Sequence, residues 1–142
     1  MTRISILSTS ETFIRYEKYV LRVAKKTCAL LRVNKISFEI TLVTQKQIQH
    51  LNKLFLGKNC STNVLSIQPP RHFVFPKSVY RVLGEIYLSP EFIRAHDQDI
   101  THMIVHGILH LKGYDHKKKS DTKKMERVEK RLLQKLATLR QP

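Results

Sequence analysis

Residues 97 to 116 read DQDITHMIVHGILHLKGYDH, and apolar side chains dominate the middle of this stretch. Projected on a helix, they cover almost the whole circumference: Ile100, Met103, Ile104, Val105, Ile108, Leu109 and Leu111. A helix that is apolar on nearly every side lies in the core of its domain. The stretch therefore predicts a buried central helix over residues 97–112, ended by a left-handed turn at Gly113.

Histidines form the one polar stripe on this helix. His106 and His110 are four residues apart, so their imidazoles project from the same face, one turn from each other. Gly113 lets the chain turn back, and His116 follows three residues later. The pattern H-x-x-x-H-x-x-G-x-x-H predicts one metal ion bound by His106, His110 and His116. Zinc is the default ion for a site built on imidazole, although nickel, copper and iron also suit this ligand.

Three protein ligands leave the fourth position of a tetrahedral zinc ion open, as in catalytic rather than structural sites. A closed structural site stays an alternative, in which Cys60, Asp115 or His72 supplies the fourth ligand. His102 lies one further turn along the helix and is displaced around it, so we expect it to support the site rather than bind the ion. The remaining histidines are interpreted as surface or loop residues: His50, His72 and His96.

The residue after the first histidine separates this segment from a well-known class of zinc enzymes. Metzincin proteases share the spacing, and a glutamate at that position is the general base of peptide hydrolysis. Here the position is Gly107, so a protease mechanism lacks its base. A phosphodiester brings its own anionic oxygens to a metal, which favours nuclease chemistry. Asp115 is a candidate for supporting a metal-bound histidine or for accepting a proton.

Composition points to a nucleic-acid partner. The 142 residues include 26 Lys and Arg against 11 Asp and Glu, a formal net charge of +15, and residues 117–140 hold 10 basic and 3 acidic residues. Such an excess favours polyanions, with a membrane surface as the weaker alternative. No apolar run approaches the length of a membrane span. The two cysteines, Cys28 and Cys60, form no C-x-x-C motif and are interpreted as buried or half-buried thiols. So few cysteines are typical of a protein in the reducing cytoplasm.

The length predicts one domain, residues 1–142. A capping box formed by Ser8 and Glu11 is expected to begin a helix that runs to about Arg32 and is over by Asn34. A second helix is expected at 44–56 and is ended by Gly57. Two more helices are expected, one beginning at Ser89-Pro90 and one at Ser120. Strands are expected at 36–43, 63–68 and 83–89, with a loop over 69–81.

Three segments together resemble the YbeY-type ribosomal RNA maturation factors: HGILHLKGYDH, LNKLFLGKNCSTNVLS (residues 51–66) and LGEIYLS (residues 83–89). The resemblance implies a single α/β (α+β) domain with a small mixed sheet packed with helices. It also implies one Zn²⁺ on His106, His110 and His116, and a zinc-dependent, single-strand-specific endoribonuclease. Its role would be maturation of small-subunit ribosomal RNA and ribosome quality control. The expected partners are ribosomal RNA precursors and ribosomal or small-subunit proteins, without DNA or membrane.

One departure from the family pattern concerns the expected RNA contacts. The family commonly has Y-R-G-K-D where this chain has Phe55-Leu56-Gly57-Lys58-Asn59, so Leu56 replaces an arginine. Lys58, Arg71, Lys117, Lys118 and Lys119 are the candidate RNA-binding residues. Leu56 motivates a second hypothesis, a ribosome-associated assembly factor whose zinc is mainly structural. A metal-dependent hydrolase of small substrates is a third hypothesis.

Overall fold

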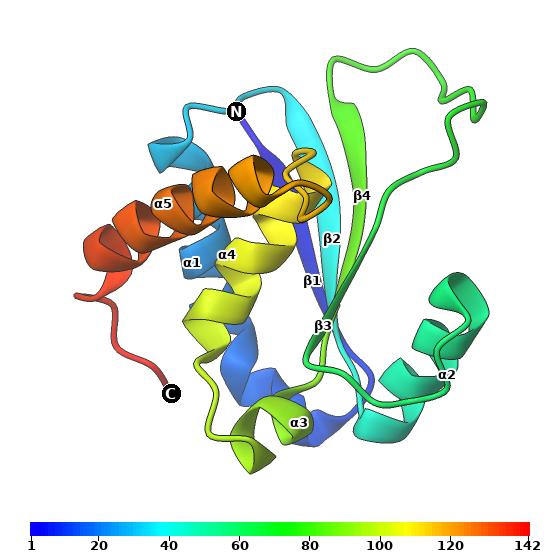
Figure 1. Cartoon of the computed structure of the whole chain (residues 1–142), viewed down its shortest axis with the longest axis vertical. Helices are drawn as coiled ribbons and strands as arrows, with labels where there is room; N and C mark the ends of the chain where they lie inside the picture. Colours follow the sequence, from blue (N-terminus) through cyan, green and yellow to red (C-terminus); the bar gives the residue numbers. More distant parts are fainter.

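A four-stranded mixed sheet runs through the molecule, with helices on both of its faces (Figure 1). The computed structural model describes all residues, 1–142. The strands are β1 (Arg3–Ser8), β2 (Ile36–Leu42), β3 (Val64–Ile67) and β4 (Arg81–Leu88), in the spatial order β1-β2-β4-β3. β1 and β4 pair with β2 in parallel, whereas β3 pairs with β4 antiparallel and forms one edge of the sheet. The predicted α/β fold with a small mixed sheet is confirmed.

Three helices cover one face of the sheet, and a fourth lies on the other (Figure 1). α1 (Ile14–Leu30), α4 (Ile100–Leu111) and α5 (Lys119–Leu136) pack against one another and form the main core with the sheet. α2 (Gln45–Leu56) packs beside β3 through a small cluster of Val43, Ile48 and Leu65. α3 (Pro90–Ala95) is a short helix that begins where β4 ends. None of the helices is long and apolar enough to span a membrane.

The central helix is α4, as the sequence predicts, and eight of its twelve residues are buried. It begins at Ile100 rather than at residue 97, because the Asp99 side chain accepts a hydrogen bond from the Thr101 backbone and caps it. Gly113 has a φ of 104°, which confirms the left-handed turn after the helix. The helix is thereby held in the core up to the residue where the chain turns back.

Near the N-terminus one prediction is wrong and one strand was not predicted. Residues 3–8 form β1, an edge strand that the sequence analysis missed, and Ser8 is its last residue rather than a helix cap. Ser10 caps a short 3₁₀ helix, η1 (Glu11–Phe13), and Ser8 instead donates a hydrogen bond to Glu17. Cys28 is buried as expected, but Cys60 is exposed because it lies in the loop after α2.

The other elements lie close to their predicted positions. α1 ends at Leu30, and α2 begins after a capping box at Thr44 and ends at Gly57, whose φ is 70°. β3 and β4 flank the long segment 68–80, which contains no helix or strand. This segment and the C-terminal end of α2 lie on the same side of the sheet, opposite α1, α4 and α5 (Figure 1).

Candidate metal centre

The three predicted ligands come together at the C-terminal end of α4. His106 and His110 project from one face of this helix, and the turn at Gly113 brings His116 back toward them. The candidate ligand atoms of the three histidines all lie within 4.8 Å of one another. His106 and His110 are half-buried and His116 is exposed, so the site is open to solvent on one side.

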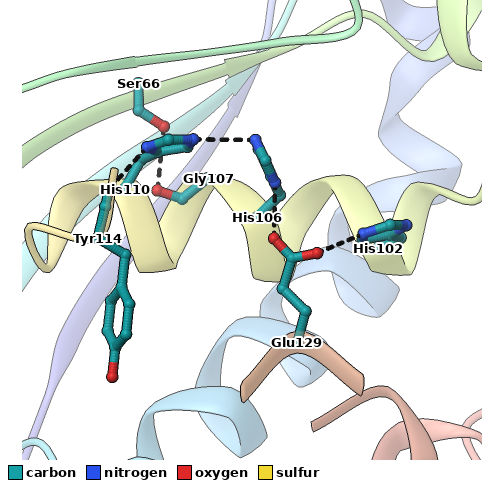
Figure 2. Close-up of polar contacts among 7 residues, drawn as sticks. All are labelled: Ser66, His102, His106, Gly107, His110, Tyr114 and Glu129. Atoms are coloured by element: carbon teal, nitrogen blue, oxygen red, sulfur yellow. Dashed lines mark hydrogen bonds and ion pairs between the residues drawn. The ribbon is translucent and has the colours of Figure 1, made fainter. Parts of the chain in front are cut away.

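The hydrogen bonds of the first two histidines fix which nitrogen faces the centre (Figure 2). His106 Nδ1 lies 2.8 Å from a Glu129 carboxylate oxygen, and His110 Nδ1 lies 2.9 Å from the Tyr114 carbonyl oxygen. Both partners are acceptors, so each ring donates its Nδ1–H. In the neutral rings the two Nε2 lone pairs then face each other, 2.9 Å apart. Two converging lone pairs repel each other unless a cation lies between them, so this donor set fits a metal ion.

Glu129 connects α5 to the histidine stripe. Its two carboxylate oxygens accept hydrogen bonds from His106 and from His102, the latter at 2.7 Å, and the residue is only 8% exposed. Burial alone raises the pKa of Glu129, but the hydrogen bonds from His102 and His106 lower it to about 2. The hydrogen bond between His102 and Glu129 raises the pKa of His102 above its usual value. A carboxylate at this position fixes the tautomer and orientation of His106, as expected of a residue that supports a metal ligand.

The environment of His110 keeps its ring neutral. Burial, with the neighbouring His106, lowers the pKa of His110 below its usual value. A metal binds only the neutral imidazole, so a lowered pKa favours binding near neutral pH.

A second group of potential ligands exists beside the first: His102, His106 and Glu129. Within it the facing atoms are already joined by N–H···O hydrogen bonds of 2.7 and 2.8 Å. The histidine N–H groups of this set are already used in these bonds, whereas the Nε2 atoms of His106 and His110 have only each other. The trio of His106, His110 and His116 is therefore the better metal site.

Gly107 faces the sheet and not the histidines. A Cβ built on it would lie 3.1 Å from an Ile86 side-chain carbon and 3.2 Å from one of Val64. Its carbonyl oxygen accepts a hydrogen bond from Ser66 Oγ at 3.0 Å (Figure 2). The helix therefore packs closely against β3 and β4 at position 107, and any larger side chain there would have to displace Ile86 or Val64.

Comparison with known proteins agrees with this geometry. The sequence model of the family described as Endoribonuclease YbeY matches residues 4–137. The chain is 32% identical to Endoribonuclease YbeY of Buchnera aphidicola subsp. Schizaphis graminum over 126 residues, which cover 83% of this chain and 75% of the relative. It is 36% identical to Endoribonuclease YbeY of Bartonella henselae over 117 residues, or 75% of this chain and 73% of the relative.

The chain belongs to the YbeY endoribonuclease family. Its fold is also similar to the solution structure of TM1509 from Thermotoga maritima, with a TM-score of 0.51 and 25% sequence identity. That similarity covers 95% of this chain and 92% of the other. Because nearly all of both chains is covered, the similarity extends over the whole fold.

A cleft of about 600 Å³ opens beside the histidines of this YbeY-family chain. Asp115, Lys117 and Leu56 line it together with His106 and His110. The Asp115 carboxylate accepts a hydrogen bond from the Lys117 backbone at 3.1 Å, and the bonds from the histidine Nδ1 atoms go to Glu129 and Tyr114 instead. Asp115 is therefore placed as a cleft residue, and its role as proton acceptor stays a prediction.

The other predicted residues lie outside this cleft. Neither Cys60 nor His72 joins the three histidines as a further ligand. The remaining candidate RNA-binding side chains are exposed but do not line the cleft: Lys58, Arg71, Lys118 and Lys119. Of the basic residues proposed from sequence, Lys117 alone reaches it.

Glu129 is the functional residue that the sequence analysis missed. It falls on the buried stripe of α5, four residues after Met125 and three before Leu132, both of which are buried. A carboxylate in line with buried apolar side chains requires a hydrogen-bonding partner in the core. That position was the available signal, since no local spacing links Glu129 to the histidines.

Proposed function

We propose that the protein is a zinc-dependent, single-strand-specific endoribonuclease that acts on ribosomal RNA precursors in the cytoplasm. Membership of the YbeY family supports a nuclease, a hydrolase of phosphodiester bonds. The observation that carries the proposal is the pair of Nε2 lone pairs that face each other beside an open cleft. The net charge of +15 supports a polyanionic substrate.

Each residue has a distinct part in the proposed reaction. His106, His110 and His116 would hold one Zn²⁺, which when bound supplies Lewis-acid polarisation of a phosphate oxygen and acidifies water. Glu129 and the Tyr114 carbonyl hold two of the rings in the orientation that ligation needs. Lys117 would contact a phosphate, and Asp115 would accept a proton. An unpaired strand bends into such a cleft more readily than a duplex does, which is the reason for single-strand specificity.

A direct test combines a ligand variant with a histidine control. His110→Ala should lose both its zinc, measured by elemental analysis of the purified chain, and its cleavage of a labelled single-stranded RNA. His50→Ala removes an exposed histidine far along the chain from the cleft and should retain both. Full cleavage by highly purified His110→Ala would reject the proposal, because the activity would then belong to a contaminant.

Ribosome quality control and contacts with small-subunit proteins are further parts of the proposal. Leu56 favours a second candidate, an assembly factor with a mainly structural zinc, because an exposed leucine lines the cleft where a nuclease needs charge. A folded His110→Ala variant that still supports maturation of small-subunit RNA in cells would favour this candidate. Loss of maturation together with loss of cleavage would favour the nuclease.

A further inference from the structure

A second cavity, of about 520 Å³, lies on the side of the sheet opposite α1, α4 and α5. Its floor includes a row of paired residues across three strands: Ser5 on β1, Glu39 on β2 and Glu85 on β4. Its walls include Phe55, from the C-terminal end of α2, and Phe73 and Phe75, from segment 68–80. The residues of the metal centre do not line it.

Three phenylalanines of this cavity present their rings to solvent, whereas Phe38, on β2, is buried. Phe73 is 57% exposed, Phe55 49% and Phe75 40%. The rings of Phe73 and Phe75 contact each other, with centroids 4.7 Å apart and planes tilted by 54°. Exposed aromatic rings gathered around one cavity mark a binding surface rather than a core. Flat aromatic ligands such as nucleobases stack on such surfaces.

The floor of the cavity offers hydrogen-bond acceptors. Glu39 and Glu85 lie directly opposite each other on neighbouring strands, and neither forms an ion pair. Glu85 accepts one hydrogen bond, from the Tyr87 hydroxyl, which leaves acceptor capacity on both carboxylates. At the rim, Arg3 stacks over the Tyr80 ring with its guanidinium 4.4 Å from the ring centre. The cavity thus combines aromatic walls, an acceptor floor and a cation at its rim.

Gln68 connects this cavity to the metal cleft, since it lines both. It follows β3, and its side-chain amide donates hydrogen bonds to the carbonyls of His110 and Leu111, at 3.3 and 3.2 Å. Consecutive residues line the two sites on the α2 side as well: Leu56 the cleft and Phe55 the cavity. The metal cleft and the aromatic cavity therefore adjoin each other at Gln68 and at residues 55–56.

We propose that this cavity binds an unpaired nucleobase of the RNA strand whose phosphodiester lies in the metal cleft. The proposal rests on the proposed nuclease function and names a base-binding subsite for it. The base stacks on the phenylalanine rings, and the Arg3 guanidinium contacts a flanking phosphate. The carboxylates of Glu39 and Glu85 accept N–H donors, so the subsite prefers guanine, which presents an N1–H and an amino group side by side. Uracil presents a single donor, N3–H, which lies between two carbonyl oxygens that the carboxylates repel.

Binding to an uncleavable strand tests the subsite separately from catalysis. The probes are two fluorescein-labelled 2′-O-methyl hexamers, one all uridine and one with a single guanosine, and the measurement is fluorescence anisotropy with the zinc-loaded protein. The double variant Phe73→Ala/Phe75→Ala should weaken binding of the guanosine probe about tenfold, within the range for loss of base stacking. Val74→Ala is the matched control, because Val74 lies between them, is 88% exposed and does not line the cavity.

The carboxylates are tested by probe preference. Wild type should bind the guanosine hexamer more tightly than the uridine hexamer, and Glu39→Gln/Glu85→Gln should reduce that preference while circular dichroism shows an intact fold. Equal binding by the phenylalanine double variant and Val74→Ala would overturn the subsite, as would equal binding of both probes by wild type. If wild type fails to cleave RNA yet binds the guanosine probe through Phe73 and Phe75, the nuclease proposal fails and the base site stands. If wild type cleaves RNA but the cavity variants do not change binding, the nuclease proposal stands and the base-binding subsite is rejected. The cavity would then be a candidate site for a protein partner.

Discussion

Glu129 holds His106 across the contact between two helices, with one carboxylate oxygen 2.8 Å from the ring Nδ1. This bond joins α5, which carries seven Lys and Arg residues, to the helix that carries two of the three candidate metal ligands. The second oxygen holds His102, so one carboxylate orders two rings of the stripe.

Replacing Glu129 by glutamine should weaken metal binding without removing a ligand. Glutamine keeps the shape of the side chain but offers a neutral and weaker acceptor, so His106 loses its orientation. We expect zinc affinity to fall roughly 10–100-fold, as for other partners of metal-bound histidines, measured by competition with a chromophoric chelator. Glu126→Gln, on the exposed face of the same helix, is the control. Equal zinc affinities of the two variants would show that Glu129 does not position the ligand.

Cys28 predicts a loss of stability at alkaline pH. Burial raises the pKa of the Cys28 thiol to about 11 from the ordinary value of 9.0, with a small opposing effect of Lys112. Because the folded chain holds the proton more tightly than the unfolded chain, the thiol stabilises the fold below pH 9 and this stabilisation is lost as the pH rises toward 11. The contribution is about 3 kcal/mol at most. Urea unfolding of Cys28→Ala should show a shallower decline over this range than wild type.

The two cysteines should also differ in reactivity. Cys60 is exposed and should react with a thiol reagent in the folded protein, whereas Cys28 should react only after denaturation. Counting the modified thiols by mass spectrometry, before and after unfolding in guanidinium, checks this. Two thiols modified at once in the native state would contradict the burial of Cys28.

Gly84 should resist substitution more than Gly57, although both have a positive φ. A Cβ on Gly84 would lie 2.1 Å from the carbonyl oxygen of Ile67, while one on Gly57 would meet no atom within 4 Å. Gly57→Ala should cost about 1 kcal/mol, the strain of a left-handed residue. Gly84→Ala adds a backbone clash between β4 and β3 and should cost on the order of 3 kcal/mol or more. Similar midpoints in chemical denaturation for the two variants would be inconsistent with this packing.

Leu56→Arg should strengthen binding of RNA in the metal cleft. The leucine is exposed and lines the cleft beside the histidines, so a guanidinium there reaches a phosphate and forms a bidentate contact. We expect an affinity gain of about tenfold, with a steeper dependence of binding on salt concentration. Leu54→Arg adds the same charge at an exposed position outside the cleft. An equal gain from both variants would assign the effect to net charge alone.

The clustering of the three histidines was predictable because their geometry is local. Helical spacing fixes the relation of His106 to His110, and one glycine turn returns His116, so no long-range contact is required. Glu129 belongs to another helix, and its partner depends on how α5 crosses α4, which no short pattern encodes. The same limit applies to the aromatic cavity, whose exposed phenylalanines come from two segments that meet only in the folded chain.

The missed strand has a different cause. β1 does alternate, with Ile4 and Ile6 packed against the core and Arg3 and Ser5 exposed. Six residues at the edge of a sheet give only a weak alternation. Parallel pairing with β2 stabilises it, and the chain then needs α1 as the crossover between the two strands.

The close approach of Gly107 to the sheet also limits how this protein can change during evolution. Some codons for glycine and glutamate differ by a single nucleotide, so mutation supplies the protease-like residue easily. The contact of α4 with Ile86 and Val64 opposes it, because even the first side-chain carbon at position 107 would press on both neighbours. A chain with this packing must therefore move Ile86 or Val64 before it can accept the glutamate base of metzincin-type peptide hydrolysis, whatever metal its three histidines would hold.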